Sequence, residues 1–341
     1  MGLAAQPARG EEDETAVSGA QSEEDERTVE VRIRPLEEPD LDVADSIMRI
    51  AFGTYLKAPD PFNVFGDSDY VHTRFRAAPE CAFAAERGGE IVGSNFATRW
   101  GSFGFFGPLT VRTDLWDQGI AGRLIEPVLE LFERWQLPLT GLFTFPESPK
   151  HVGLYQKFGF WPQALTPVLE KPVGPHHDPG DYAVYSALGA DEQEVALEDC
   201  RRVAEAVHPG LDLEREIVAV ASQRMGETIL LEDRAGLVGF AVCHCGQATE
   251  AGSGACAVKF GAVLPGDGAA ARFERLLGAC ESLAAERGLS RLTAGMNSSR
   301  HLAYRALLER GYRPFLNGLT MLRPNEPGFD RSGSFTIGDL R

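Results

Sequence analysis

The sequence predicts an α/β (α+β) protein built from two tandem copies of one domain. Short β-type segments alternate with helix-period segments along the 341 residues. Matching positions recur 152 residues apart, pairing Val111 with Val263 and Leu124 with Leu276. A Pro/Gly-rich stretch, residues 173–181, separates the two matching regions as a linker would. A tandem duplication of one sheet-and-helix unit explains all three observations.

Five segments follow from this reading. Residues 1–28 are rich in Ala, Gly, Ser and Glu, and we expect them to form a disordered acidic tail. Residues 29–173 form the first domain, residues 174–181 the linker and residues 182–324 the second domain. Residues 325–341 are a C-terminal extension with a short S-F-T-I strand. This strand is expected to pair with a sheet edge of its own chain or of a partner chain, which leaves a homodimer open.

The order of elements is clearest in the first copy. Alternation and turn residues predict strands at residues 28–34, 82–86, 91–98, 103–111, 138–145 and 160–171. Helical periodicity predicts helices at residues 40–55, 69–76, 119–136 and 148–158. The last of these has clear limits, because Ser148 is a typical N-cap, Pro149 follows it and Gly159 ends it. Pro127 inside the long helix should bend it.

Composition excludes several classes of partner. The net charge of −17 argues against nucleic acid and anionic membranes. There is no apolar run of membrane-spanning length and no apolar signal-peptide core, so we expect a cytoplasmic protein. The six cysteines lack the spacing of a disulfide framework or zinc site, and we expect no metal at Cys243-His244-Cys245 or at His176-His177.

Residues 109–122, L-T-V-R-T-D-L-W-D-Q-G-I-A-G, form the most informative stretch of the chain. An apolar strand end passes through a glycine-bearing turn into a helix. Such a turn leaves backbone N–H groups unpaired at the positive end of the helix dipole, which suits phosphate. In the duplicate, the 152-residue spacing replaces Gly119 with Ala271, Gly122 with Glu274 and Tyr155 with Leu307. We therefore expect the second copy to be a degraded scaffold and the first to hold the site.

This stretch, together with the later S-P-K-H-V-G-L-Y-Q-K-F-G-F and the element order, resembles the GNAT superfamily of acetyl-CoA-dependent N-acetyltransferases. The resemblance implies two tandem GNAT-like domains, each a mixed, mostly antiparallel twisted sheet flanked by helices. It also implies a splayed central strand pair that holds acyl-CoA. The implied acetyl-CoA contacts are Leu109, Thr110, Val111, Arg112, Asp117, Gln118, Gly119, Ile120, Ala121, Gly122, Ser148 and Tyr155. No metal is implied.

Two positions depart from the family pattern. Trp116 stands where the family has Arg or Gln, which could reshape the phosphate grip and leave charge to Arg112 or Arg123. Ser148 stands where Asn is usual, and we read it first as an N-cap and second as a CoA contact. The resemblance makes Tyr155 the acid that protonates the departing thiolate.

The base that deprotonates the amine is less clear, because residues 103–111 contain no carboxylate. Glu147 and His151 are the nearest candidates, with a water chain as the favoured alternative. The predicted function is acetyl transfer from acetyl-CoA to a primary amine of a small molecule or peptide, in the first copy. The alternative is a non-catalytic acyl-CoA-binding or regulatory protein of the same fold.

Overall fold

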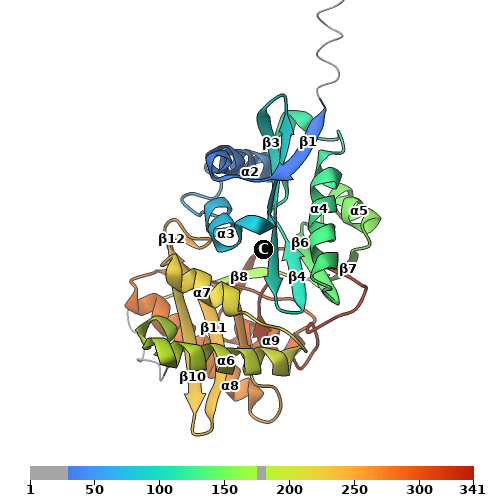
Figure 1. The fold of residues 1–341 in the computed structure, drawn as a ribbon. Helices are drawn as coiled ribbons and strands as arrows, with labels where there is room; N and C mark the ends of the chain where they lie inside the picture. The colour runs from blue at the N-terminus through green and yellow to red at the C-terminus, as the bar shows by residue number, and fades with distance from the viewer. Residues whose placement is uncertain (1–29, 175–181) are drawn as a thin grey trace, which may run out of the picture.

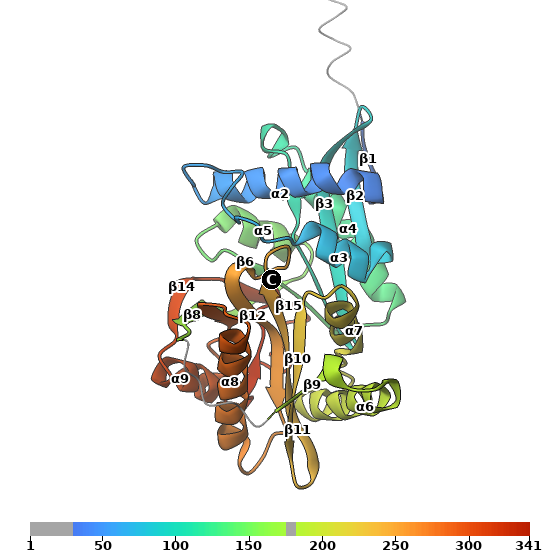
Figure 2. The same ribbon diagram turned by 90° about the vertical axis from the view of Figure 1, so that its left-hand side faces the viewer.

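The computed structural model describes residues 30–174 and 182–341 and shows two sheet-containing halves that pack against each other (Figures 1 and 2). The predicted acidic tail and His176-His177 lie outside the described residues. The chain end, Arg341, lies between the two halves (Figure 1). In the described part of the chain, no helix has the length and apolar character needed to cross a membrane.

The first half contains strands, helices and short 3-10 turns in the predicted order. They are β1 (Val31–Pro35), η2 (Glu38–Asp40), α2 (Leu41–Tyr55), α3 (Val71–Ala77), η3 (Pro79–Cys81), β2 (Ala82–Arg87), β3 (Glu90–Trp100), β4 (Phe103–Phe106), β5 (Thr110–Val111), η4 (Thr113–Leu115), α4 (Ile120–Arg134), β6 (Leu139–Thr144), α5 (Pro149–Lys157), β7 (Trp161–Leu165) and β8 (Val168–Pro172).

The second half repeats this order and adds one short strand at its end. Its elements are β9 (Ala183–Val184), η5 (Tyr185–Ala187), α6 (Ala190–Val207), α7 (Glu214–Ser222), β10 (Gly226–Asp233), β11 (Gly236–Gly246), β12 (Gly252–Val263), α8 (Ala269–Glu286), β13 (Arg291–Gly295), α9 (His301–Glu309), β14 (Arg313–Leu316), β15 (Leu319–Arg323) and β16 (Thr336–Ile337).

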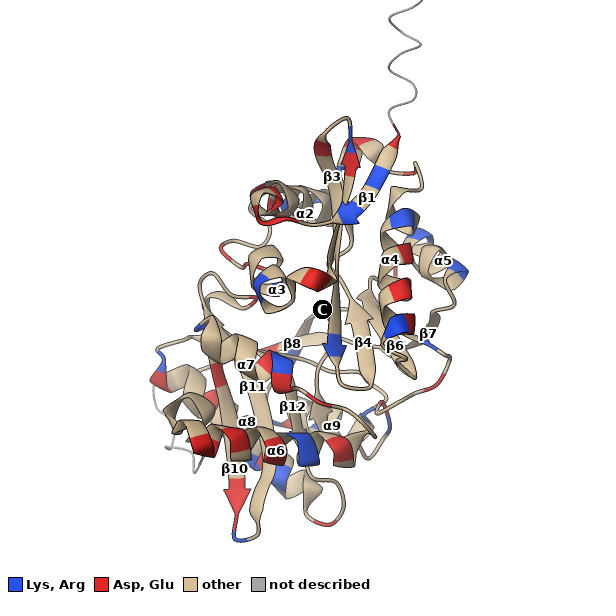
Figure 3. Ribbon diagram, viewed as in Figure 1, with Lys and Arg blue, Asp and Glu red and all other residues tan. Residues whose placement is uncertain are grey.

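Helices cover both faces of each sheet. In the first half, α2 and α3 lie on one side of β3, and α4 and α5 lie on the other (Figure 1). Helix α4 buries the face predicted from its periodicity, including Ile120, Leu124 and Val128. The helix continues through Pro127. Acidic residues are spread over both halves, with several on the outer helix α6, in keeping with the net charge of −17 (Figure 3).

The two halves exchange one strand each. Strand β15, from the second half, lies between β6 and β7 of the first sheet, and β8, from the first half, lies between β13 and β14 of the second. Where the two connections cross, the backbones of Thr166 and Gly318 exchange hydrogen bonds of 2.8 and 3.2 Å. The prediction of one strand over residues 160–171 that closes the first domain was therefore wrong. The strand is interrupted at Thr166-Pro167, because proline has no backbone N–H to donate to a neighbouring strand.

The second copy keeps more of the loop than the 152-residue spacing indicated. Helix α4 begins after Gly119, at φ 78°, and α8 begins after Gly268, at φ 81°. The pairing of Gly119 with Ala271 was wrong, because two length changes cancel in the sequence. The second connection lacks a turn equivalent to η4, while α8 has 18 residues against 15 in α4. Gly268 therefore occupies the place of Gly119 in the second half.

Candidate functional site

The central strands of the first sheet separate partway along their length. Strand β4 runs parallel to β6 from the pair Phe103–Leu139 to the pair Phe106–Leu142. Beyond Phe106, strand β5 pairs with β3 alone, with Gly93 opposite Val111. We call the gap between β5 and the end of β6 the first fork. Thr110 and Val111 are thus placed with one backbone edge free of strand pairing, as the resemblance implied.

Trp116 covers part of this free edge. Its indole Nε1 donates a hydrogen bond of 2.8 Å to the carbonyl oxygen of Val111. The side chain remains more than one-third exposed. Lys150 lies 5.8 Å from the centre of the Trp116 ring, and it forms an ion pair of 2.5 Å with Asp117. The unusual residue at the start of the loop therefore occupies part of the strand edge that β6 leaves unpaired.

The loop before α4 presents the start of a helix toward the fork. Asp117 and Gly119 both have positive φ values, 66° and 78°. This turn leads directly into Ile120, Ala121 and Gly122, whose amides belong to the unsatisfied first turn of an α-helix. A Cβ at Gly119 would meet open space, so backbone conformation rather than crowding favours glycine there. Gln118 lies in the same turn and is exposed.

Arg112 lies beside the loop but is paired elsewhere. Its guanidinium bonds to Asp114 at 2.8 Å and to Glu90 at 3.2 Å. The hydrogen bond that Arg112 donates to Asp114 is the main reason that the pKa of Arg112 is raised. Lys150 is therefore the cation that the described structure brings directly against the loop, through Asp117.

Helix α5 places Tyr155 at the base of the fork. Ser148 caps the helix, because its hydroxyl accepts a hydrogen bond of 3.3 Å from the His151 amide. Tyr155 is buried one turn later, and its ring centre lies 5.9 Å from that of Phe106. Burial raises the pKa of Tyr155 well above its usual value. The hydroxyl therefore holds its proton firmly in the resting protein.

The two predicted bases lie beside an aromatic group from α2. The ring of Tyr55 lies 5.2 Å from His151 and 4.8 Å from Phe145. Burial is the main cause of the lowered pKa of His151, and Lys150 adds to it. Glu147 is exposed at the end of β6. The structure thus brings His151 and Glu147 to the rim of the first fork.

The equivalent gap in the second sheet is filled. Strand β12 runs parallel to β13 from Ala255 to Val258, and further along it pairs with β16 at Gly261 and Ala262. Gly338 then forms a β-bridge with Met296, and its amide donates a hydrogen bond of 3.0 Å to the Gly295 carbonyl. The extension predicted to pair with a sheet edge therefore pairs with its own chain, inside what we call the second fork.

Arg300, at the start of α9, holds this segment in place. Its guanidinium forms an ion pair of 2.7 Å with Asp330. It also donates hydrogen bonds of 3.1 and 3.0 Å to the carbonyl oxygens of Thr336 and Gly338. The Arg300 side chain is 2% exposed. The C-terminal segment thus fills the second fork, and the buried Arg300 guanidinium holds it there through these contacts.

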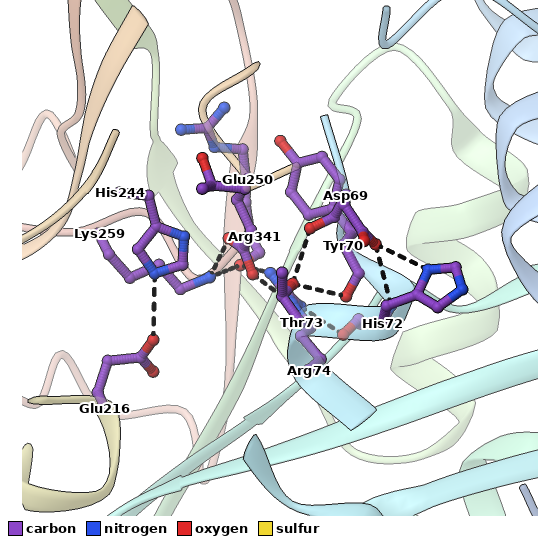
Figure 4. A network of polar contacts seen from close by, with 12 residues as sticks. Asp69, Tyr70, His72, Thr73, Arg74, Glu216, His244, Glu250, Lys259 and Arg341 are labelled. Atoms are coloured by element: carbon purple, nitrogen blue, oxygen red, sulfur yellow. Dashed lines mark hydrogen bonds and ion pairs between the residues drawn. The ribbon is translucent and has the colours of Figure 1, made fainter. Parts of the chain in front are cut away.

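A polar cluster between the halves was missed by sequence reasoning (Figure 4). Arg74, on α3, bonds to Glu250 at 2.7 Å, and Glu250 also pairs with Lys259 on β12. The Arg74 guanidinium donates further to the backbone carbonyls of Gly107 and Arg341. Gly107 precedes the first fork, so this cluster contacts the fork from the second half. No local sequence pattern marks residues that are so far apart along the chain.

Within residues 30–174 and 182–341, no group of three or more His, Cys, Asp or Glu side chains is arranged to hold a metal ion. Cys243, Cys245 and Cys256 are free thiols on adjacent strands, and Cys243 and Cys256 are buried.

Comparisons with known proteins agree with this geometry. Residues 46–160 match the family model described as the acetyltransferase (GNAT) family. A search of curated proteins finds no significant match. A putative acetyltransferase from Pyrococcus horikoshii superposes with a TM-score of 0.64 at 15% identity, covering 97% of this chain and 98% of that one. A GCN5-related N-acetyltransferase from Sphaerobacter thermophilus gives 0.52 at 16% identity, covering 87% and 96%.

These likenesses extend over both halves and share the architecture of two mixed sheets with flanking helices. The predicted fold class and the resemblance drawn from residues 109–122 are both confirmed. Residues 46–160 thus match the acetyltransferase (GNAT) family, and the chain as a whole has the fold of solved GNAT acetyltransferases.

Proposed function

We propose that the protein transfers an acetyl group from acetyl-CoA to a primary amine of a small molecule or peptide, and that the first fork is its acyl-CoA site. The observation that carries this proposal is the contrast between the two forks. Val111 has a backbone edge free of strand pairing, whereas the corresponding stretch of β12 is paired with β16. The loop at Gly119 adds helix N-terminal amides suited to a pyrophosphate.

The residues around the first fork suit the chemistry. An alkylamine has a pKa of about 10.4, so it must lose a proton before it can attack. The neutral nitrogen then bonds to the acetyl carbon, the C–S bond breaks, and the second amine proton leaves. Backbone N–H groups around Val111 would stabilise the oxyanion. Tyr155 would give its proton to the departing thiolate, and burial, which raises the pKa of the phenol, ensures that this proton is present.

The two matched glycines allow the acyl-CoA site to be tested by calorimetry on the full chain. We expect Gly119→Asp to weaken acetyl-CoA binding by about tenfold or more, because a carboxylate would stand where the pyrophosphate binds. Gly268→Asp introduces the same residue at the same helix position and the same φ region, so it controls for backbone effects. Its affinity should equal that of the wild type. A loss of binding in Gly268→Asp alone would place the site in the second half.

Tyr155→Phe tests the acid. We expect turnover to fall by about 100-fold or more while the affinity for acetyl-CoA stays the same, since only the proton donor is removed. The measurement is CoA release at saturating acetyl-CoA, with polyamines, aminoglycosides, amino acids and basic peptides as acceptors. Val152→Ala, on the same helix, is the control for packing effects. Unchanged turnover in Tyr155→Phe would remove this residue from the mechanism.

One observation favours the alternative of a non-catalytic acyl-CoA-binding protein. The Trp116 indole donates a hydrogen bond to the Val111 carbonyl, with which a pantetheine arm would otherwise pair. The CoA-release assay separates the two functions. An enzyme turns over at least one amine of the panel, whereas a binding protein takes up acetyl-CoA and leaves every amine unmodified.

A further inference from the structure

A buried histidine of the second half has no hydrogen-bond partner. His244, on β11, is 2% exposed. Among the residues that the structure describes, neither of its ring nitrogens is hydrogen-bonded. A carboxylate oxygen, Oε1 of Glu216, lies 3.6 Å from Nε2, which is beyond normal hydrogen-bond length. Because an unpaired polar group is costly to bury, these nitrogens require another partner, and water is the simplest one.

Two small cavities provide room for that water. The larger, of about 40 Å³, is lined by His244 together with Arg74, Thr98, Glu216 and Lys259, among others. The smaller, of about 10 Å³, has His244 opposite Asp339 and Arg341. One water needs a cavity of about 10–15 Å³, so the first space has room for water and the second is at the lower limit for one molecule. His244 thus stands between two polar, water-sized spaces.

The wall of the larger cavity includes residues that neighbour the base of the first fork. Its wall includes Ala97 and Thr98 of β3, which pair with Phe106 and Phe105. Phe106 is the last residue of β4 to pair with β6. Arg74, another wall residue, donates to the carbonyl of the next residue, Gly107. The cavity wall that contains His244 therefore also contains the strand neighbours of Phe105 and Phe106 and the hydrogen-bond donor to Gly107.

We propose that His244 is the proton acceptor of the acetyl transfer, reached from the acceptor amine through the cavity waters. This inference rests on the proposed function and gives the second half a part in the reaction. The ammonium passes one proton through water to the imidazole, which later releases it to solvent. After the C–N bond forms and the C–S bond breaks, the thiolate receives a proton from Tyr155, and the second nitrogen proton restores the Tyr155 phenol. One acetyl group is moved and one net proton is released.

Glu216 suits the role of stabilising the protonated imidazole. Its Oε2 accepts a hydrogen bond of 3.2 Å from Trp100, which leaves Oε1 facing His244. Burial alone would raise the pKa of Glu216, but His244 and Lys259 hold it below the usual value. The carboxylate is therefore charged and placed to attract the imidazolium.

Other charged groups also face this region and will shape its pH dependence. They come from α3, β3, α7, the loop after β11, β12 and the C-terminal segment, and they comprise Tyr70, Arg74, Arg99, Arg215, Glu216, Glu250, Lys259, Asp339 and Arg341. Because Arg74, Glu250 and Lys259 are already joined by ion pairs, they do not compete for the proton.

The test compares His244→Gln with wild type in the full chain, using an amine from the acceptor panel. We expect the kcat at neutral pH to fall about 100-fold, with an unchanged KM for acetyl-CoA. The deficit should shrink as pH rises, because more of the amine is then already neutral. Added imidazole should partly restore His244→Ala. His72→Gln is the control, since His72 lies on α3 and points away from His244 (Figure 4).

Each result decides a separate point. Unchanged kcat and an unchanged pH profile in His244→Gln would overturn the inference and leave the proposed function standing. A wild-type chain that acetylates no amine of the panel would overturn both. Should His244→Gln fail to fold, Glu216→Gln replaces it, because a glutamine can keep the bond from Trp100. That variant should show a smaller fall in kcat with the same recovery at high pH, and full activity would count against the proposal.

Discussion

Arg74→Met should lower the free energy of unfolding by about 3–5 kcal/mol, which urea denaturation would measure. Arg74 and Glu250 are each about 8% exposed, so the substitution leaves a buried carboxylate with Lys259 as its remaining partner. It also removes the donor to the carbonyls of Gly107 and Arg341. The loss should therefore be much larger than that of a surface ion pair.

Arg76→Met is the matched control, because Arg76 lies two residues further along α3 and is exposed. It should change stability by no more than about 0.5 kcal/mol. The pH dependence gives a second check. Arg74 and Lys259 hold the pKa of Glu250 far below its usual value despite burial. The lowered pKa of Glu250 stabilises the folded protein. This stabilisation is fully present above the pKa of a glutamate in the unfolded chain, about 4.3, and is lost as the pH falls further. The stability of Arg74→Met should therefore fall less in acid than that of the wild type. Equal losses of stability in Arg74→Met and Arg76→Met would refute the stabilising role given to Arg74.

Arg300→Met should release the segment that fills the second fork. The guanidinium is buried and contacts Asp330, Thr336 and Gly338 at once, so we expect a loss of about 3–5 kcal/mol. Hydrogen exchange should accelerate at the amides of Gly338 and Val263, which bond to Gly295 and Phe335 in the docked state.

Arg305→Met provides the comparison for this release, since Arg305 lies on the same helix in an exposed ion pair with Glu309. Its exchange pattern should match the wild type. Acetyl-CoA affinity should be the same in all three proteins, because the proposed site lies in the other half. Slow exchange at Gly338 in Arg300→Met would show that β-pairing alone holds the segment.

Local features of this fold could be predicted well. The limits of α5 were readable because Ser148, Pro149 and Gly159 each have one strong conformational preference. The buried face of α4 followed from its period, and the first fork followed from a resemblance carried by residues 109–122. These are features in which a few neighbouring residues decide the structure.

Features that depend on distant pairing could not be predicted. Strands β8 and β15 are equivalent segments of the two copies, so their apolar patterns fit either sheet and do not reveal the exchange. The role of Gly268 was hidden because a shorter connection and a longer helix cancelled in the alignment. Arg74, Glu250 and Arg341 meet only through the packing of both halves, and single charged residues carry no signal of such a meeting.

The exchanged strand has a consequence for the order in which the protein can be made. Although the first copy ends in the sequence near residue 173, its sheet lacks a member between β6 and β7 until Leu319–Arg323 has left the ribosome. Domains usually fold one after another during synthesis, starting at the N-terminus. Here the first half remains incomplete during synthesis, with the facing edges of β6 and β7 unpaired, until β15 has been made. A strand of the second copy is therefore needed to complete the half proposed to bind acetyl-CoA.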